Sequence, residues 1–320
     1  MSTNSANLLN KLFEEVSGDL IAHYDNSVLM PSAELISNSY NLVGAVGNKM
    51  RIPVTNAWTT GASGIAESAD IAGETGAVQD FNPSAIDLSV AKRGSFSYVT
   101  AEALEDGGLS TVSNAVSLRL ARSIAQGTDQ SAFKYMLNNT DSAPGTMAEL
   151  DGADSNVECV NNSLTGNLDL CPVFSPEAMA YAVKRQPELK MWEDVKLDQT
   201  SMVATMRNGF AQIQRDFIKC VAGNTAIGAS AQKANLQAFG EAVAKLRGEN
   251  APTDAAGFYF AAISPAIELQ LVDQITHIGS GTVGSLSSTG DRVLMDALIG
   301  QAVGVRFLRS NNIVKNVAAS

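Results

Sequence analysis

Apolar side chains recur at spacings of three and four residues between positions 109 and 137, the strongest helical pattern in the chain. The positions that share this face are Leu109, Val112, Val116, Leu120 and Ile124, with Ala121, Ala125 and Ala132 beside them. The spacing predicts a long amphipathic helix, in which about 28 residues at 1.5 Å each extend over roughly 40 Å. Such a helix either crosses the core of a large domain or acts as a structural beam.

Four shorter segments also show helical signals. Leu8, Leu9, Leu12, Phe13, Val16 and Leu20 predict an amphipathic helix that ends near Gly18 or shortly after it. The segment ANLQAFGEAVAKLRGENAP predicts a helix closed by Gly248, and Pro265 opens another helix in PAIELQLVDQITHI. In SPEAMAYAVKRQ we expect a helix with Ser175 as its N-cap and Pro176 at its first position.

A period of two predicts strands around the first long loop. Ile86, Leu88 and Val90 share one parity in IDLSVAKRGSFSYVT, as do Phe96 and Tyr98, and we expect a turn at Lys92, Arg93 and Gly94. Residues 54–85 are rich in Gly, Ala, Ser and Thr and cannot build a core of their own. We therefore expect residues 52–100 to form a long two-stranded excursion.

The second half of the chain mixes helices with strands. Strands are predicted in LDLCPVF, around Gly209 and in GFYFAAIS. The stretch GQAVGVRFLRSNNI alternates Val303, Val305 and Phe307 with Gly304, Arg306 and Leu308, before a polar exit from Arg309 to Asn312. With no internal repeat and no Pro-rich linker, we expect one continuous, elongated structure.

The composition indicates a folded, acidic protein. A chain of 320 residues with 45% hydrophobic residues can bury a sizeable core. Its net charge of −11 disfavours binding to a phosphate backbone and argues against a nucleic-acid reader. No uncharged apolar run of about 18 residues predicts a membrane span, and no basic leader precedes an apolar core. A soluble, non-secreted product is expected.

The metal-ligating residue types are few and scattered. Cys159, Cys171 and Cys220 are an odd set at irregular spacing without a C-x-x-C pair, and only His23 and His277 could join them. Reduced thiols without a metal are therefore expected. A solvated or helix-capping role is the commoner one for the two histidines.

Motifs for phosphate or nucleophile chemistry are weak. GSGTVG at 279–284 matches G-x-G-x-x-G, but a dinucleotide site needs a strand before it and a helix after it. Here a helix precedes and a loop follows, so we interpret the segment as a glycine loop. DGADS near Asp151 lacks the closing Glu of a calcium loop, and nothing supports a Ser-His-Asp triad. We predict no catalytic, cofactor-binding or metal-binding residue.

The aromatic residues could in principle form a platform for bases. Trp58, Trp192, Phe258 and Tyr259 have no accompanying cluster of Lys or Arg, which a stacking groove for single strands requires. We expect them to be core or interface anchors. Arg306 and Arg309 are too few for a nucleic-acid footprint.

Several stretches, taken in order, resemble the major capsid proteins of tailed bacteriophages, which have the Hong Kong 97 fold. FNPSAIDLSVAKRGSFSYVTAEALED resembles the returning strand of that family's extended loop, and ARSIAQGTDQSAFKYML resembles the end of its spine helix. AVAKLRGENAPTDAAGFYFAAISPAIELQLVDQ is similar to its axial-domain helix, strand and next helix. IGQAVGVRFLRSNNI resembles its Gly-x-x-x-Gly strand. Each motif is degenerate, so their order carries the resemblance.

The resemblance implies an α+β, Hong Kong 97-like fold divided along the chain. Its parts would be an N-terminal arm (1–51), an extended loop (52–100), the spine helix and peripheral domain (101–157), a peripheral or axial segment (158–225) and an axial domain (226–320). In the family, the block at about 158–222 usually follows the Ser-Asn strand. A circular permutation and an unrelated insertion both explain the earlier position. A last strand on the outer edge of the peripheral sheet would contradict permutation.

The resemblance also implies a structural role without catalysis or cofactors. The subunit would assemble into hexamers and pentamers of an icosahedral head that encloses double-stranded DNA without sequence-specific binding. Its implied partners are a portal, a separate scaffolding protein and an optional decoration protein. The resemblance implies no membrane interaction. Its location would be the virion capsid, after assembly in the host cytoplasm. Lys92 in the extended loop could form a cross-link or, as is commoner, be a solvated turn residue.

Two other functions are compatible with the sequence. An encapsulin-like compartment shell would share the fold and house cargo enzymes instead of DNA. A hydrolase-like α/β enzyme is the third hypothesis, and it has no motif to support it.

Overall fold

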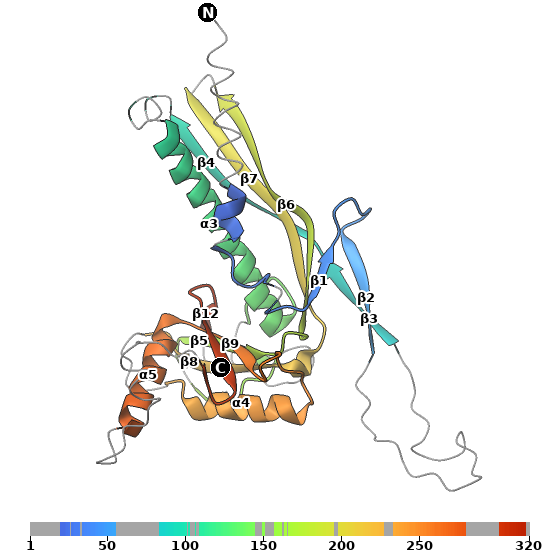
Figure 1. Cartoon of the computed structure of the whole chain (residues 1–320), viewed down its shortest axis with the longest axis vertical. Coiled ribbons are helices and arrows are strands. Elements are labelled where there is room, and N and C mark those ends of the chain that lie inside the picture. Colours follow the sequence, from blue (N-terminus) through green and yellow to red (C-terminus); the bar gives the residue numbers. More distant parts are fainter. Residues whose placement is uncertain are drawn as a thin grey trace, which may run out of the picture.

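The chain folds around two sheets that helix α3 joins (Figure 1). The computed structural model describes residues 20–25, 27–32, 34–55, 83–100, 102, 106, 109–144, 149–150, 157–161, 163–164, 166–194, 198–226, 233–279 and 301–317. Residues 20–25 and 27 are helical. The helix predicted for residues 8–20 lies outside this part of the chain, apart from Leu20.

Helix α3 (Leu109–Asn138) confirms the long helix predicted from the sequence. Its 30 residues correspond to about 45 Å. Leu120 and Ile124 on its predicted apolar face are buried against the first sheet, whereas Phe133 and Met136 near its end belong to the core of the second. The helix therefore acts as a structural beam: it packs against the first sheet along part of its length and against the core of the second sheet near its end.

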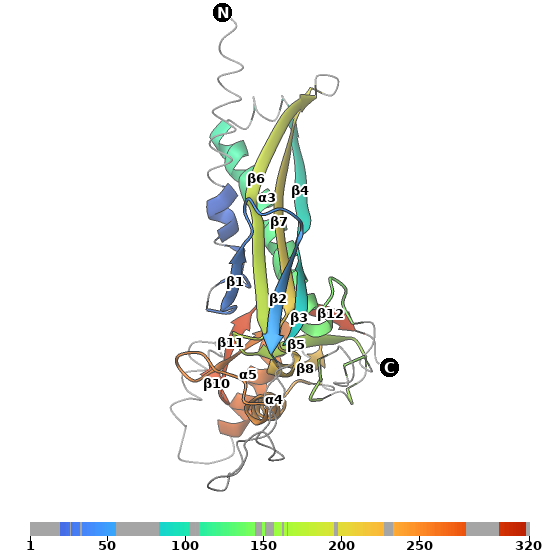
Figure 2. The same cartoon turned by 90° about the vertical axis from the view of Figure 1, so that its right-hand side faces the viewer.

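The first sheet has four strands in the order β1-β6-β7-β4. Their bounds are Asn38–Asn41 for β1, Met179–Asp194 for β6, Gln199–Gln212 for β7 and Ala91–Thr100 for β4. Strand β1 runs parallel to β6, and the other neighbours are antiparallel. Figure 2 shows this sheet and α3 side by side, and Met202, Ala204 and Met206 of β7 fill the space between them.

The helix predicted after Ser175 is wrong, because residues 179–194 form strand β6. Met179, Ala180, Tyr181 and Ala182 are all buried. They lie between the α3 side of the sheet and the extended hairpin described below, so the sequence shows no alternation of apolar and polar positions there. Pairing along β7 outweighs the helical preference of Ala, Met, Lys and Gln.

The second sheet has the order β10-β11-β9-β5-β12, and β8, which is not part of this order, pairs with β5 from Leu168 to Phe174. The bounds are Leu168–Phe174 for β5, Ile218–Asn224 for β8, Tyr259–Ile263 for β9, Gln301–Ala302 for β10, Val305–Arg309 for β11 and Val314–Val317 for β12. Every residue of β5 is buried, as expected for the central strand. A short 3-10 turn, η3 (Arg215–Phe217), leads into β8.

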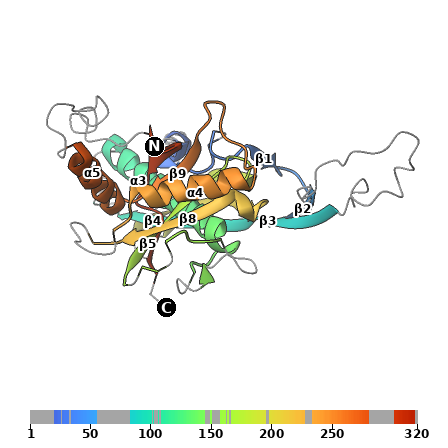
Figure 3. The same ribbon diagram turned by 90° about the horizontal axis from the view of Figure 1, so that it is seen from below.

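Helices α4 (Leu236–Gly248) and α5 (Pro265–Gly279) confirm two predictions and pack on the second sheet. Asn235 caps α4 by accepting a hydrogen bond from Ala238 N at 2.6 Å, and Ser264 Oγ accepts one from Ile267 N at 3.3 Å at the start of α5. Figure 3 shows α4 crossing the underside of the molecule.

The strand predicted in GQAVGVRFLRSNNI is shorter than its alternation suggested. Val303 and Gly304 have φ angles of 54° and 81°, so they form the tight turn of a β10–β11 hairpin. Strand β11 begins only at Val305. Its polar exit is held to the sheet because Ser310 N donates to Ile263 O at 2.9 Å.

The extended hairpin consists of β2 (Lys49–Thr55) and β3 (Pro83–Ser89), paired antiparallel. The turn predicted at residues 92–94 is wrong: β3 continues through Val90 directly into β4. Gly94 serves packing instead, because a Cβ there would lie 3.3 Å from Thr205 Cγ2 and 3.4 Å from Ala204 O. Residues 56–82 lie outside the described chain.

The segment at about 158–222 contributes to both sheets, with β5 and β8 in the second and β6 and β7 in the first. Strand β12 lies beside β5 and not on the outer edge of the four-stranded sheet. The arrangement that would contradict a permuted order is therefore not observed, and the permuted order stays a prediction.

Candidate interaction surfaces

The extended hairpin is anchored by a small apolar cluster on one face of its strands. Ile52, Val54 and Leu88 of the hairpin pack on the alanines of β6 and β7, Ala180, Ala182 and Ala211. On the other face of the hairpin, Arg51 Nε lies 3.3 Å from Asp87 Oδ1, with 76% and 47% of the two side chains exposed. In Figure 1 the hairpin points away from the two sheets, and the face that carries Arg51 and Asp87 is a surface.

A buried carboxylate fastens the N-terminal segment to α3. Asp129 accepts hydrogen bonds from Met30 N at 3.0 Å and Leu29 N at 3.1 Å through Oδ1. Asn312 Nδ2 donates to its Oδ2 at 3.3 Å. Burial raises the pKa of Asp129, while the hydrogen bonds from Met30, Leu29 and Asn312 lower it and reduce the shift. One side chain therefore joins three distant segments, and none of these hydrogen-bond partners is charged.

A polar network runs between α3 and the first sheet. Arg93 Nε donates to Asn208 Oδ1 at 2.9 Å, and Asn208 Nδ2 donates to Thr128 Oγ1 at 3.2 Å. Arg93 also donates to Ser131 Oγ on α3, which in turn donates to Asp141 at 2.8 Å. The network explains why Arg93, predicted in a turn, lies on the helix side of the sheet.

Three aromatic side chains lie exposed on the opposite face of that sheet. Phe96, Tyr98 and Trp192 are 56%, 59% and 49% exposed, with the Phe96 ring centroid 6.3 Å from that of Tyr98 and 6.1 Å from that of Trp192. Their neighbours Val99 and Leu189 point to α3, so alternation along the strands places the three rings away from it. We call these three residues the aromatic face.

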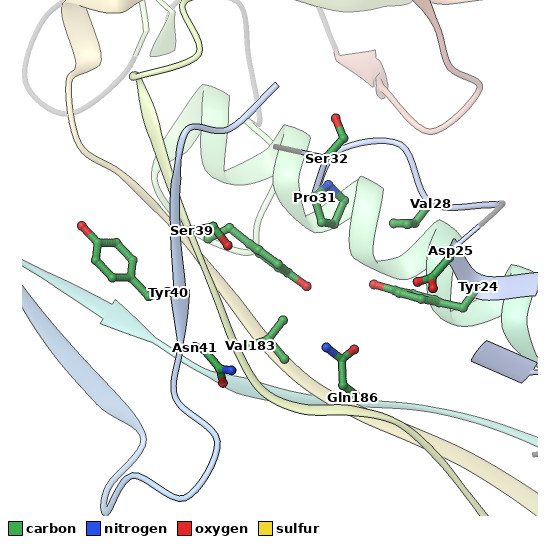
Figure 4. A pocket seen from close by; sticks show the side chains of 11 residues that line it. Tyr24, Asp25, Val28, Pro31, Ser32, Ser39, Tyr40, Asn41, Val183 and Gln186 are labelled. Carbon is green, nitrogen blue, oxygen red and sulfur yellow. The ribbon is translucent and has the colours of Figure 1, made fainter. Parts of the chain in front are cut away.

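A pocket of about 490 Å³ lies between the N-terminal segment and β6 (Figure 4). Tyr24, Ser32 and Asn41 line it together with Tyr181 and Gln186 of β6. No atom of the described residues meets hydrogen-bond geometry with the buried Tyr24 hydroxyl, although Thr128 and Tyr181 lie beside it. Burial raises the pKa of Tyr24 to about 12, so this hydroxyl is neutral at physiological pH.

The two arginines near the end of the chain are structural. Arg306 lies 3.3 Å from Asp254 and over the rings of Phe258 and Phe260, with 5.7 Å to each centroid. Arg309 lies 2.7 Å from Glu268 on α5. Both are paired with acids, and the absence of a nucleic-acid footprint stays a prediction.

The remaining aromatic and histidine candidates are not brought together. Tyr259 is buried and donates to Ala251 O at 2.8 Å, as expected of a core anchor, whereas Trp192 lies on the aromatic face. His23 is partly exposed on the N-terminal helical segment, and His277 lies in α5. Trp58, Asp151 and residues 280–284 lie outside the described chain, and Lys92 is exposed on β4.

Two arrangements have no signal in the sequence, the Asp129 contacts and a close approach of Cys159 to Cys220. Asp129 and its partner Met30 are 99 positions apart, and no local pattern predicts such a contact. Cys159 and Cys220 lie opposite each other in a parallel bridge, and all three cysteines are free and buried. Among the described residues, no group of three or more His, Cys, Asp or Glu could hold a metal ion.

In the described part of the chain, no helix is long and apolar enough to cross a lipid bilayer.

Comparison with known proteins finds similarity in structure and not in sequence. No family model and no curated protein matches the chain. A structure of the bacteriophage JBD30 capsid is 8% identical and matches over 89% of this chain and 92% of that chain, with a TM-score of 0.51. The JBD30 procapsid is 9% identical over 97% and 99% of the two chains, with a TM-score of 0.52. These matches confirm the α+β, Hong Kong 97-like fold.

Proposed function

We propose that this chain is the major capsid protein of a tailed bacteriophage, a structural subunit that assembles into hexamers and pentamers of an icosahedral head. The observation that carries the proposal is the shared fold with the JBD30 procapsid subunit over nearly the full length of both chains. Likeness over the whole of both chains is more informative than likeness of one domain, because the hairpin and the arm-like N-terminal segment are included.

The surfaces described above support a subunit that needs neighbours. A hairpin of two strands is marginal in water without covering elements, and only one face of its described strands is packed here. The aromatic face leaves three large rings in solvent, which is typical of a contact site. We infer that copies of the same chain cover these surfaces in the shell.

The division of the chain follows from the same proposal. Residues 1–51 would be the arm, 52–100 the extended loop, 101–157 the spine helix and peripheral domain, and 226–320 the axial domain. The segment 158–225 would be shared, since its strands enter both sheets. Because β4 lies in the four-stranded sheet, the part of the extended loop that projects from the sheets would end at Ser89.

The proposed partners are a portal, a separate scaffolding protein and a decoration protein. The enclosed double-stranded DNA would be held without sequence-specific contacts, because a chain with a net charge of −11 repels phosphate. Assembly would take place in the host cytoplasm, and the final location would be the virion. We propose no catalytic role.

Electron microscopy of the purified, full-length protein, expressed with and without its phage's scaffolding protein, tests this function. Closed shells or isolated hexamers and pentamers are the expected result. Particles that enclose DNA in infected cells would support the phage head, whereas shells filled with a cargo enzyme would indicate an encapsulin-like compartment. A monomer that forms no oligomer in either expression would overturn both shell functions.

A further inference from the structure

Cys159 and Cys220 meet although they are 61 positions apart in the sequence. Cys220 N donates to Glu158 O at 2.9 Å, and Val160 N donates to Cys220 O at 2.9 Å. These two bonds place Cys159 directly opposite Cys220, as in neighbouring parallel strands. Such strands lie about 4.8 Å apart, within the Cα separation of about 4.4–6.8 Å that a disulfide spans.

The two thiols also differ in their surroundings. The neighbouring Cys220 thiol lowers the pKa of Cys159, while burial raises the pKa of Cys220. Cys159 Sγ lies 3.5 Å from Asn161 Oδ1, and Asn161 is fixed by two 2.7 Å hydrogen bonds to the backbone of Ala222. Cys159 is therefore the better nucleophile of the pair.

We propose that Cys159 and Cys220 form a dithiol that hydrogen peroxide converts into an intrachain disulfide. The Cys159 sulfur attacks one peroxide oxygen: an S–O bond forms, the O–O bond breaks, and water leaves with the thiol proton. Cys220 then attacks the resulting sulfenic sulfur, so that an S–S bond forms and a second water leaves. Two thiols and one peroxide give one disulfide and two waters.

The third cysteine is a matched control. Cys171 lies beside Val221 in the pairing of β5 with β8, whereas Cys220 lies beside Pro172. Because side chains alternate along a strand, Cys171 and Cys220 point to opposite faces of the sheet. Burial raises the pKa of Cys171 strongly, so we expect this thiol to stay reduced.

The oxidant must be small. Cys159 and Cys220 are 2% and 0% exposed, so hydrogen peroxide can reach them during brief local openings and a bulky aromatic disulfide cannot. The cross-link would tie the segment that follows α3 to β8 and close a loop around β5, β6 and β7. Closing a loop of this length stabilises a fold mainly by restricting the unfolded chain.

The test treats the folded, full-length protein with hydrogen peroxide, removes the peroxide, and alkylates the denatured chain. We expect the three free thiols to fall to one, with a peptide that joins residues 159 and 220 in the mass spectrum and a thermal midpoint several degrees higher. Dithiothreitol should restore three thiols. Ellman's reagent, a bulky aromatic disulfide, should not react with the thiols of the folded protein.

Three variants separate the outcomes. Cys171→Ser should still form the disulfide, and Cys159→Ser should keep both remaining thiols at the same peroxide dose, whereas Cys220→Ala should form no disulfide and stop at the sulfenic acid of Cys159. The peptide map of the oxidised wild-type protein tests the disulfide even if a variant does not fold. A map that shows Cys171 in the cross-link, or over-oxidised single cysteines without any disulfide, would overturn the proposal. Because monomers and shells contain the same pair, the result is independent of the proposed assembly.

Discussion

Gly209 marks the closest approach between the extended hairpin and the first sheet. A Cβ at this position would lie 2.0 Å from Ser89 O, which is backbone and cannot turn aside. Gly209→Ala should therefore lower the free energy of unfolding by about 3 kcal/mol or more, measured by denaturant titration.

Gly127 is the control for that substitution. It lies inside α3, and no neighbouring atom comes within 4 Å of the position that a Cβ would take there. Gly127→Ala should raise the free energy of unfolding by about 0.5–1 kcal/mol, because alanine restricts the unfolded chain and favours a helix. Equal effects of the two alanines would contradict the close packing of β7 on the hairpin.

Asp129 gives the stability a predictable pH dependence. Burial raises its pKa in the folded state, so the folded protein binds a proton more tightly than the unfolded chain. Its favourable contribution is complete below the ordinary pKa of about 3.9 and is lost as the pH rises through the folded pKa. Asp129→Asn can keep the bonds from Leu29 and Met30 if Asn312 turns its amide.

The measurement is the denaturant midpoint between about pH 3 and pH 7. We expect the Asn variant to lose part of the decline in stability that the wild type shows over this range. Asp216→Asn, on the exposed turn before β8, should leave the decline unchanged. A wild-type slope retained in Asp129→Asn would argue against a raised pKa at this site.

At the scale of elements, α3 is the part on which both sheets depend. Leu120 is fully buried between the helix and β7, so Leu120→Ala should cost about 2–5 kcal/mol through lost burial and a cavity. Arg119 is exposed on the same turn, and Arg119→Ala should change stability by no more than about 0.5 kcal/mol. Thermal unfolding of both variants checks the difference.

Elements with a complete local signal could be predicted from the sequence. Helices α3, α4 and α5 show one apolar face or a clear cap, and β5 and β9 are short apolar runs between polar breaks. Strand β6 could not be predicted, since its first residues are buried on both faces and show no period. Two turns were also mispredicted. Gly94 allows close packing and does not mark a turn. Val303 does lie in a turn, but it adopts a left-handed φ that β-branched residues rarely take.

The interaction surfaces were predictable only in part. The parity of Phe96 and Tyr98 is visible in the sequence, but their exposure depends on which face of the sheet α3 covers. The contacts of Asp129 and the pairing of Cys159 with Cys220 arise from long-range topology. Neither leaves a trace in the spacing of residues along the chain.

At the scale of the whole molecule, the aromatic face should matter for assembly and not for folding. Removing exposed rings with Phe96→Ser and Trp192→Ser should leave the thermal midpoint of the monomer nearly unchanged. If other copies bury these rings, the yield of shells in electron microscopy should fall several-fold, because buried aromatic anchors dominate contact energies.

Lys92→Ser is the matched control, because Lys92 is exposed on the same face of β4 and carries no ring. It should assemble like the wild type. A double variant that forms shells at the wild-type yield would show that the aromatic face stays in solvent in the assembled particle.

Strand β5 has a consequence for the order of events during synthesis. Its partners are β8, β9 and β12, and β12 is translated more than about 140 codons after β5, a separation that makes folding slow. Until residues 314–317 leave the ribosome, the Leu168–Leu170 part of β5 lacks its pairing with β12. The nascent chain therefore cannot complete its second sheet before nearly all of this sequence has been made, and until then β5 presents an open strand edge of the kind that invites pairing with another chain.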